Sequence, residues 1–231
     1  FNHQLNSSIE DQVGNYNVNL INGFRASSAK IFLKPIKNNP NLTILTNTEV
    51  LKLNYENRKI SSLKIKHKKK IIDIKPNIGT ILSTGSIMTP YLLLKSGIGK
   101  AEELRQYNIP VQFNSPHVGK NFQDHLGLDY LYKTHMPTLN DELGTWTGRI
   151  KTVLRYFYNR RGPLSLSLNQ GGGYINWKSL DPYPNIQLYF NPLTYSVAYK
   201  NKRPLLKTDK FSGFIIGFNS CRPKSLGEVK L

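Results

Sequence analysis

Apolar and polar residues alternate along most of residues 50 to 75, with the period of a half-buried strand. Turn residues interrupt the alternation at Asn57-Arg58-Lys59 and in the lysine-rich run from Lys64 to Lys70. The pattern predicts a three-stranded antiparallel meander with the lysines at the solvated tip of a hairpin. The alternating segment Asn41 to Thr46 is also expected to be a strand. Ile78 to Leu82 is apolar throughout, as is typical of a strand buried in a parallel sheet.

The run from Thr80 to Gly99 combines the signals of a strand, a turn and a helix. Small residues at Ser83 to Ser86 follow an apolar lead, and Thr89-Pro90 have the residue types of a helix N-cap and first helical position. Gly97 and Gly99, at the end of the run, suit a helix C-cap. We expect a turn small enough for a phosphate or a cofactor to approach its backbone N–H groups.

Three further segments have helical spacing. Residues 26 to 39 predict a short helix, Ala101 to Tyr107 predict a second, and Trp146 to Tyr158 predict an amphipathic third. The apolar positions that share a face are Ala29, Phe32 and Leu33 in the first helix, and Ile150, Val153, Leu154 and Phe157 in the third. Core packing is the expected role of the first set.

The second half of the chain changes to aromatic-rich alternation at about residue 128. Ile186 to Phe190 and Phe211 to Cys221 predict strands, and Gly171-Gly172-Gly173 predicts a place where the backbone closely approaches another segment. The expected fold class is α/β (α+β). The expected domains are residues 1–127, with an N-terminal arm at 1–22, and residues 128–231, a mostly antiparallel sheet with a helix on one face.

Composition narrows the class of protein. The chain has 231 residues, 39% of them hydrophobic, which is ordinary for a packed globular protein. No run of about 18 apolar residues predicts a membrane span. The single cysteine, Cys221, favours a reducing compartment. We therefore expect a cytoplasmic location, with peripheral attachment to a membrane as the open alternative.

Charge raises a rival function. The chain has 32 Lys+Arg against 14 Asp+Glu, a net charge of +18, which permits binding to a polyanion such as nucleic acid. The basic residues are spread along the whole chain instead of forming one motif, which argues against a nucleic-acid partner. A basic polyanion-binding module stays as the alternative from a different class.

Motifs for other chemistries are weak. The five histidines are scattered, so no metal site is expected. Asp124 and His125 are adjacent and cannot orient one another as members of a catalytic triad do, and no serine elbow exists. The chain begins with Phe1, and its last residues read as the start of a strand. Our working hypothesis is therefore a piece of a longer protein.

Five segments, in order, resemble the glucose-methanol-choline (GMC) oxidoreductases. They are Gly23 to Ala29 (Gly-x-Arg-x-Ser), Asn41 to Ile44 (the Asn-Leu strand), Gly85 to Gly99 (a small turn, Thr-Pro and Ser-Gly-x-Gly), Val118 to His125 (Val-Gly-x-Asn-x-Gln-Asp-His), and Arg222 to Val229 (Arg-Pro-x-Ser-x-Gly). Choline dehydrogenases are the nearest likeness, through Arg149 to Tyr174 and Pro184 to Gln187.

The resemblance implies an FAD-dependent enzyme that oxidises an alcohol by hydride transfer to flavin. It implies a partial FAD-binding domain of the glutathione-reductase type and a partial substrate domain built on an antiparallel sheet. The family's Gly-x-Gly-x-x-Gly turn and its histidine base match no residue here. No catalytic residue is therefore assigned, and the piece alone is expected to be inactive.

The same resemblance implies binding residues. Those for the cofactor are Val50, Ser83, Thr84, Gly85, Ser86, Asn121, Asp124 and His125. Gln170 takes the place of the acidic residue that faces the trimethylammonium group in the choline branch, and a neutral amide supplies no counter-charge. The expected partners are a small-molecule alcohol and an unknown electron acceptor: oxygen, a quinone or an electron-transfer protein. A flavin-containing lyase of the same family is a further alternative.

Overall fold

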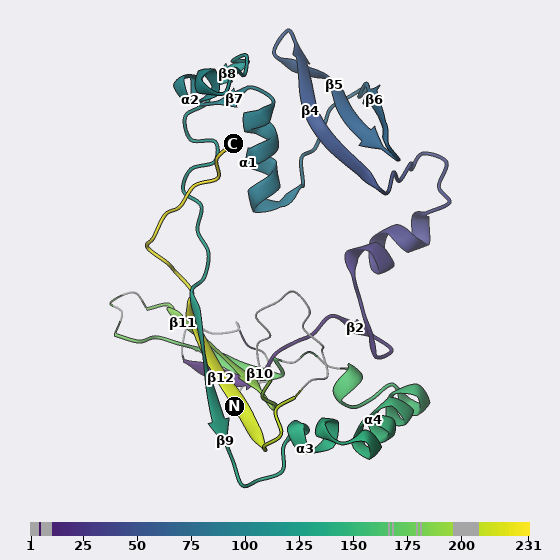
Figure 1. Cartoon of the computed structure of the whole chain (residues 1–231), viewed down its shortest axis with the longest axis vertical. Helices are drawn as coiled ribbons and strands as arrows, with labels where there is room; N and C mark the ends of the chain where they lie inside the picture. Colours follow the sequence, from purple (N-terminus) through teal and green to yellow (C-terminus); the bar gives the residue numbers. More distant parts are fainter. Residues whose placement is uncertain are drawn as a thin grey trace. The chain divides into compact units, whose positions relative to one another are not determined.

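The computed structural model describes residues 5, 11–165, 167, 169–178, 180, 182–195 and 208–231. Parts of the predicted arm at 1–22 and of the choline-like stretch at 149–174 therefore lie outside the described residues. The chain forms two compact units (Figure 1). The sheet unit consists of Phe1–Ile36 and His125–Pro223, and the meander unit of Lys37–Asp124 and Lys224–Leu231. Neither unit is continuous in sequence, unlike the predicted ranges 1–127 and 128–231.

The sheet unit is built on five antiparallel strands in the order β1-β10-β11-β12-β9. Their bounds are Gln12–Asn15, Gly171–Ile175, Ile186–Asn191, Gly213–Ser220 and Gly127–Lys133. Strand β1 lies inside the predicted arm and pairs with β10, which explains why the first residues belong to this unit. The predicted antiparallel sheet is confirmed, and with the helices it makes a mixed α+β chain.

The glycines of β10 allow this strand to approach its neighbours closely, as predicted. A Cβ at Gly172 would lie 2.6 Å from the ring of Tyr16, and one at Gly173 would lie 2.9 Å from Val13. Real Cβ atoms do not come so close to other heavy atoms. Glycine is therefore required at both positions if β1 and the Tyr16 ring are to keep their places.

The sheet unit also contains short helical elements, which lie between its strands along the chain. They are η1 (Ala29–Leu33), η2 (Lys34–Ile36), α3 (Leu139–Gly144), α4 (Trp146–Asn159) and η3 (Pro163–Ser165), with the small hairpin β2 (Leu20–Ile21) and β3 (Phe24–Arg25). The predicted helix at 26–39 is reduced to η1 and η2. Its predicted core face is wrong, because Phe32 is 67% exposed and no residue of either element is buried.

The meander unit contains the predicted three-stranded sheet, in the order β4-β5-β6. Its strands are Thr48–Glu56, Lys59–His67 and Lys70–Ile74, and Lys68 and Lys69 form the turn between the last two. The other elements are α1 (Gly85–Lys95), α2 (Ala101–Gln106) and the parallel pair β7 (Ile98–Gly99) and β8 (Phe113–Asn114). Meander, turn and α2 agree with the sequence pattern.

Two predicted strands of this unit do not form. Asn41 to Thr46 and Ile78 to Leu82 carry no strand pairing, and Ile78 and Ile81 are almost fully exposed. A strand needs a neighbour to receive its backbone hydrogen bonds, and none of the described residues provides one here. Alternation and apolar character alone are therefore not sufficient for a strand.

Helix α1 begins earlier than predicted. Its N-cap is Thr84 instead of Thr89, and Pro90 lies inside the helix. The end agrees better with the sequence: Ser96 is the C-cap, and Gly97 follows with a φ of +91°. A Cβ at Gly97 would collide with the carbonyl of Pro110, so the left-handed turn and the close approach both require glycine.

Candidate functional site

The turn before α1 is exposed and lacks a side-chain cap. Residues Ser83 to Ser86 are all exposed, and the Thr84 hydroxyl shares a 2.8 Å hydrogen bond with the Thr89 hydroxyl instead of capping the helix. Gly85 has a φ of +90°, and no heavy atom lies within 4 Å of where its Cβ would stand. The first N–H groups of α1 therefore face open space at the positive end of the helix dipole.

Strand β4 holds this helix in place. The Leu53 backbone N–H donates a 2.9 Å hydrogen bond to the hydroxyl of Ser96, which is buried at the C-terminal end of α1. Leu92 and Leu94 of the same helix are also buried. Val50 lies on β4, three residues before Leu53. The structure thus places Val50 and the exposed turn within one assembly of strand and helix.

The loop with Asn121 is fixed by the last residues of the chain. Val229 donates to the Gly119 carbonyl at 2.7 Å, and Phe122 and Gly227 exchange backbone hydrogen bonds in an antiparallel bridge. Asn121 and Gly119 adopt positive φ values of 57° and 82°. This pairing explains why residues 224–231 belong to the meander unit.

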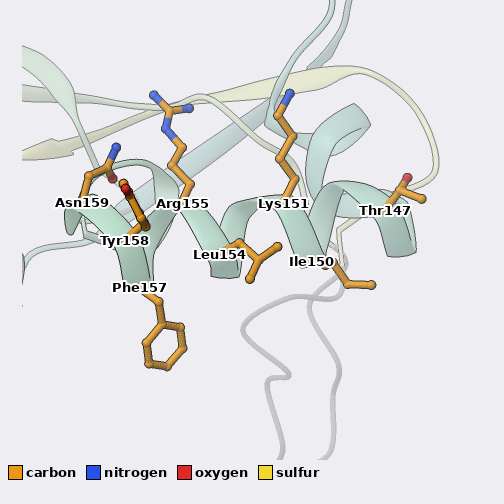
Figure 2. A pocket seen from close by; sticks show the side chains of 8 residues that line it. All are labelled: Thr147, Ile150, Lys151, Leu154, Arg155, Phe157, Tyr158 and Asn159. Carbon is orange, nitrogen blue, oxygen red and sulfur yellow. The ribbon is translucent and has the colours of Figure 1, made fainter.

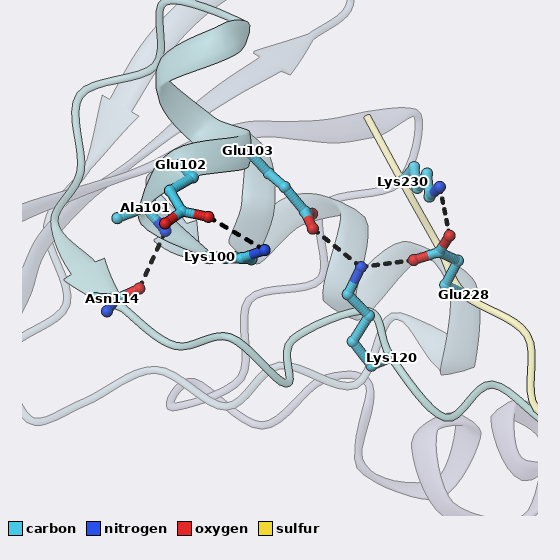
Figure 3. Close-up of polar contacts among 8 residues, drawn as sticks. All are labelled: Lys100, Ala101, Glu102, Glu103, Asn114, Lys120, Glu228 and Lys230. Carbon is cyan, nitrogen blue, oxygen red and sulfur yellow. Dashed lines mark hydrogen bonds and ion pairs between the residues drawn. The ribbon is translucent and has the colours of Figure 1, made fainter.

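Lys120 joins two acidic residues from different segments (Figure 3). Its Nζ lies 3.2 Å from Glu103 of α2 and 2.5 Å from Glu228, which also pairs with Lys230. The bonds from Lys120 and Lys230 lower the pKa of Glu228 to about 2, and Glu228 and Glu103 raise the pKa of Lys120. The cluster holds the loop and the C-terminal segment together.

The exposed groups fit an anionic dinucleotide. Between Lys75 and Ala101 the sequence has no acidic residue, so the segment that contains the turn carries no charge that would repel a diphosphate. The turn offers backbone N–H donors and small side chains, which are the groups that phosphates require for close approach. The turn at Ser83 to Ser86 is therefore chemically suited to the diphosphate of FAD.

His125 lies in the sheet unit, at the residue where the chain enters it. Its Nδ1 is 3.1 Å from the Nδ2 of Asn219, a buried residue of β12. The side-chain partner fixes the imidazole ring beside the sheet. Asp124 is exposed and belongs to the meander unit, so these neighbours in sequence are anchored by different units.

One face of the five-stranded sheet carries a hydrogen-bonded polar cluster. The Gln187 side-chain amide donates to the hydroxyls of Tyr16 (3.2 Å) and Tyr174 (3.3 Å). Tyr16 in turn donates to the Leu188 carbonyl at 2.5 Å, and burial raises its pKa. Gln170 precedes β10, where its carbonyl accepts from the Tyr16 N–H at 3.1 Å. The predicted substrate residue thus adjoins this cluster through the backbone.

A second bond on the same sheet face joins Tyr189 to Asp129. The Tyr189 phenol donates to Asp129 Oδ1 at 2.5 Å. The pKa of Tyr189 is raised to about 12, mainly by burial and to a smaller extent by this hydrogen bond. A Cβ at Gly217 would overlap the Tyr189 ring. The ring occupies the space beside this glycine of β12 and its hydroxyl reaches Asp129 of β9, so the cluster extends from β10 to β9.

Sequence reasoning missed Tyr16, Tyr174 and Tyr189 as a group. Tyr174 pairs with Gln187 and with Gln12, and Tyr189 pairs with Gly217, so the strand register places these residues on one face. In β11 polar residues repeat at every second position, from Gln187 through Tyr189 to Asn191, and this was the available signal. Tyr16 lies outside any strand and gave no signal.

Two further findings concern metal binding and membrane crossing by the described part of the chain. No group of three or more His, Cys, Asp or Glu residues is arranged there to hold a metal ion. No helix among the described residues has the length and apolar character needed to cross a membrane.

Comparison with known proteins identifies the class. A family model described as GMC oxidoreductase matches residues 2–127, more than half of the chain. The chain belongs to the GMC oxidoreductase family. This confirms the resemblance inferred from the five segments, and the predicted cofactor, FAD, agrees with it.

Individual relatives are similar over nearly the whole chain. The "Alcohol dehydrogenase [acceptor]" of Pseudomonas putida is 30% identical over 100% of this chain and 41% of its own length. The "Oxygen-dependent choline dehydrogenase" of Paraburkholderia xenovorans is 29% identical over 91% of this chain and 36% of its own. The chain thus spans about two fifths of the length of these relatives.

Solved structures share the fold. A formate oxidase of Aspergillus oryzae, studied for its FAD modification, superposes with a TM-score of 0.78 at 23% identity, over 92% of this chain and 40% of that one. A pyridoxine 4-oxidase described as from Mesorbium loti gives 0.73 at 23% identity, over 95% and 38%. At this level of identity the likeness speaks for the fold alone.

Proposed function

We propose that this chain supplies part of an FAD-dependent oxidoreductase that acts on the CH–OH group of an alcohol. The meander unit is assigned to an FAD-binding domain of the glutathione-reductase type, and the sheet unit to the substrate domain. The observation that carries the assignment is the exposed, uncapped turn at Ser83 to Ser86 within a segment that matches the family. The relatives named for alcohol and choline oxidation support the substrate class.

The proposed roles follow from the chemistry of each group. When bound, FAD supplies the acceptor for the hydride that leaves the alcohol carbon. Backbone N–H groups of the turn hold phosphate, and Asn121, Asp124 and His125 border the cofactor. Gln170 and the cluster around Gln187 offer neutral donors and acceptors, which suit a hydroxyl group. We therefore favour an uncharged alcohol over choline, whose cation gains little from an amide.

Flavin binding tests the cofactor role. Ser86→Glu places a negative charge beside the proposed diphosphate, and we expect it to weaken FAD binding at least about tenfold, equivalent to about 1.4 kcal/mol. Gln106→Glu makes the same charge change at an exposed position of α2 and serves as the control. Quenching of flavin fluorescence measures both variants. Equal affinities for the two would refute the placement of FAD at this turn.

Flavin reduction tests the reaction. No residue of this chain is assigned as the base that accepts the hydroxyl proton, so the 231-residue chain is expected to oxidise no alcohol by itself. Anaerobic bleaching of the flavin absorbance by alcohols measures this. Turnover by the purified chain would contradict the proposal. In a longer form that includes a base, bleaching supports an oxidoreductase, and its absence points to the lyase branch.

A further inference from the structure

Helix α4 has an inverted orientation relative to its own unit. Its polar side packs inward: the Thr152 hydroxyl, 1% exposed, donates to Glu142 of α3 at 2.7 Å, and Arg149 donates to the Leu143 carbonyl at 2.6 Å. The Tyr156 hydroxyl donates to the Gly23 carbonyl at 3.0 Å. The helix is therefore held by hydrogen bonds from the side that an amphipathic helix usually turns to water.

The apolar side of α4 faces outward instead. We call Trp146, Ile150, Leu154 and Phe157 the α4 stripe; they are exposed by 77%, 52%, 62% and 66%. Ile150, Leu154 and Phe157 of this stripe border an open hollow of about 890 Å³ (Figure 2). Leaving four large apolar side chains in water forgoes the free energy that their burial would release. Such a stripe indicates a contact surface.

Basic side chains border the α4 stripe. Figure 2 shows Lys151 and Arg155 leaving the helix together, on a different side from Ile150, Leu154 and Phe157. Both are exposed, and α4 contains no Asp or Glu. The two aromatic residues near its ends, Trp146 and Tyr158, are of the type that settles at the headgroup level of a bilayer.

We infer that the α4 stripe docks on an anionic lipid bilayer, lying in the plane of the interface. An apolar stripe beside basic residues, with a low overall hydrophobicity, is the pattern of interfacial helices. At about 1.5 Å per residue the 14-residue helix is about 21 Å long, so it lies on the membrane without spanning it. The inference does not depend on the proposed enzymatic function.

Two other occupants fit less well. A second copy would bring Lys151 and Arg155 of both copies together with no acidic residue on either helix, which costs repulsion. A groove in an acidic protein must enclose a helix from several sides, but the side of α4 with Arg149, Thr152 and Tyr156 is already packed. A flat surface needs only the side that is free.

Vesicle binding tests the inference with the full 231-residue chain. We expect sedimentation with vesicles of phosphatidylcholine plus phosphatidylglycerol, and much weaker sedimentation with phosphatidylcholine alone. The double variant Lys151→Gln/Arg155→Gln should weaken binding about 30-fold, since each basic residue near an anionic surface contributes about 1 kcal/mol. Leu154→Ser should weaken it at least about tenfold, the effect expected from withdrawing one leucine side chain.

Matched controls keep the result specific. Lys68→Gln/Lys69→Gln removes the same charge from the hairpin turn of the meander unit, and Ile71→Ser removes an apolar side chain that is 62% exposed, as Leu154 is. Both controls should bind within about threefold of the unchanged chain. Circular dichroism confirms that each variant is folded. In a Trp177→Phe background, Trp146 fluorescence should shift to the blue on anionic vesicles and stay unchanged on neutral ones.

Several results would overturn the inference. The first is that the chain does not bind vesicles, and the second is that the hairpin controls lose as much vesicle affinity as the α4 variants. The third is a Trp146 emission that does not respond to lipid. The fourth is a change of sedimentation coefficient in Leu154→Ser without lipid, which would indicate that the stripe binds a second copy. Binding by this chain but not by a form as long as its relatives would mean that further polypeptide covers the stripe, and would also overturn it.

Discussion

Helices α1 and α4 both contain leucine, yet they place it in opposite surroundings. Helix α1 buries Leu92 and Leu94 and exposes its N-terminal turn. Helix α4 buries the hydroxyl-bearing Thr152 and exposes Leu154. Helical periodicity therefore predicts that a helix forms, but the partner residues decide which side faces the protein. The following predictions test this contrast.

The largest expected difference is between two identical substitutions. Leu92→Ala should reduce the free energy of unfolding by about 2–5 kcal/mol, because it leaves a cavity where the side chain is buried. Leu154→Ala should change it by no more than about 0.5 kcal/mol, since its side chain is mostly in water. Urea unfolding followed by circular dichroism measures both. Equal losses would show that α4 is packed through its apolar side after all.

The polar side of α4 should matter next. Thr152→Val keeps the branched shape but removes the donor to Glu142, and leaves a carboxylate without its bond. We expect a loss of about 1.5–3 kcal/mol, the usual value for a hydrogen bond to a charged group. Thr147→Val, at an exposed position of the same helix, is the control. A Thr152 variant as stable as this control would contradict the inverted orientation.

A smaller effect is expected at the polar end of α1. Ser96→Ala removes the acceptor of the Leu53 N–H, and this buried donor has no replacement there. We expect a loss of about 1–2 kcal/mol. Ser83→Ala, at the exposed other end, should cost less than about 0.5 kcal/mol. The contrast fails if both serine variants unfold at the same urea concentration.

The smallest effect concerns pH near the C-terminal segment. Because Lys120 and Lys230 lower the pKa of Glu228 to about 2 from its ordinary 4.5, the carboxylate stabilises the folded segment above about pH 4.5. This contribution is lost as the pH falls toward 2. The contribution of Lys120, whose pKa is raised, is present below its ordinary 10.5 and is lost at higher pH.

The amide resonance of Val229 can report this titration, because its N–H donates to Gly119 inside the same segment. We expect its chemical shift to change only well below pH 4 in the unchanged chain. In Lys120→Met the change should move to higher pH, since the main cause of the lowered pKa is gone. A titration at the ordinary glutamate value in the unchanged chain would show that the cluster is not formed.

The sequence predicted local structure better than assembly. The meander, the strands β11 and β12, and α4 could be predicted because the spacing of apolar residues within each segment indicates its secondary structure. The predicted strand at Ile78 to Leu82 is wrong because an apolar segment becomes a strand only beside a partner strand, and the described residues provide none there. The predicted start of α1 is wrong because Thr89-Pro90 has the residue types of an N-cap and first helical position. The helix instead begins earlier and contains Pro90 in its interior.

The candidate site shows the same limit. The exposed turn at Ser83 to Ser86 could be found from its small residues and from family resemblance. Tyr16 could not, because its contact with Gln187 depends on the pairing of β1 with β10. The assignment of FAD and substrate residues stays a prediction until binding is measured.

The pairing of β1 has a consequence for synthesis on the ribosome. Tyr16 meets Leu188 at a separation of 172 residues, so the edge of the sheet cannot close until the ribosome has added all the residues between them. At about 5–20 residues per second, β1 waits roughly ten to thirty seconds for its partner. The meander unit waits similarly for Val229 to reach Gly119. Nascent chains of this protein therefore expose unpaired segments of both units at once, and chaperones that bind such segments should recognise them during translation.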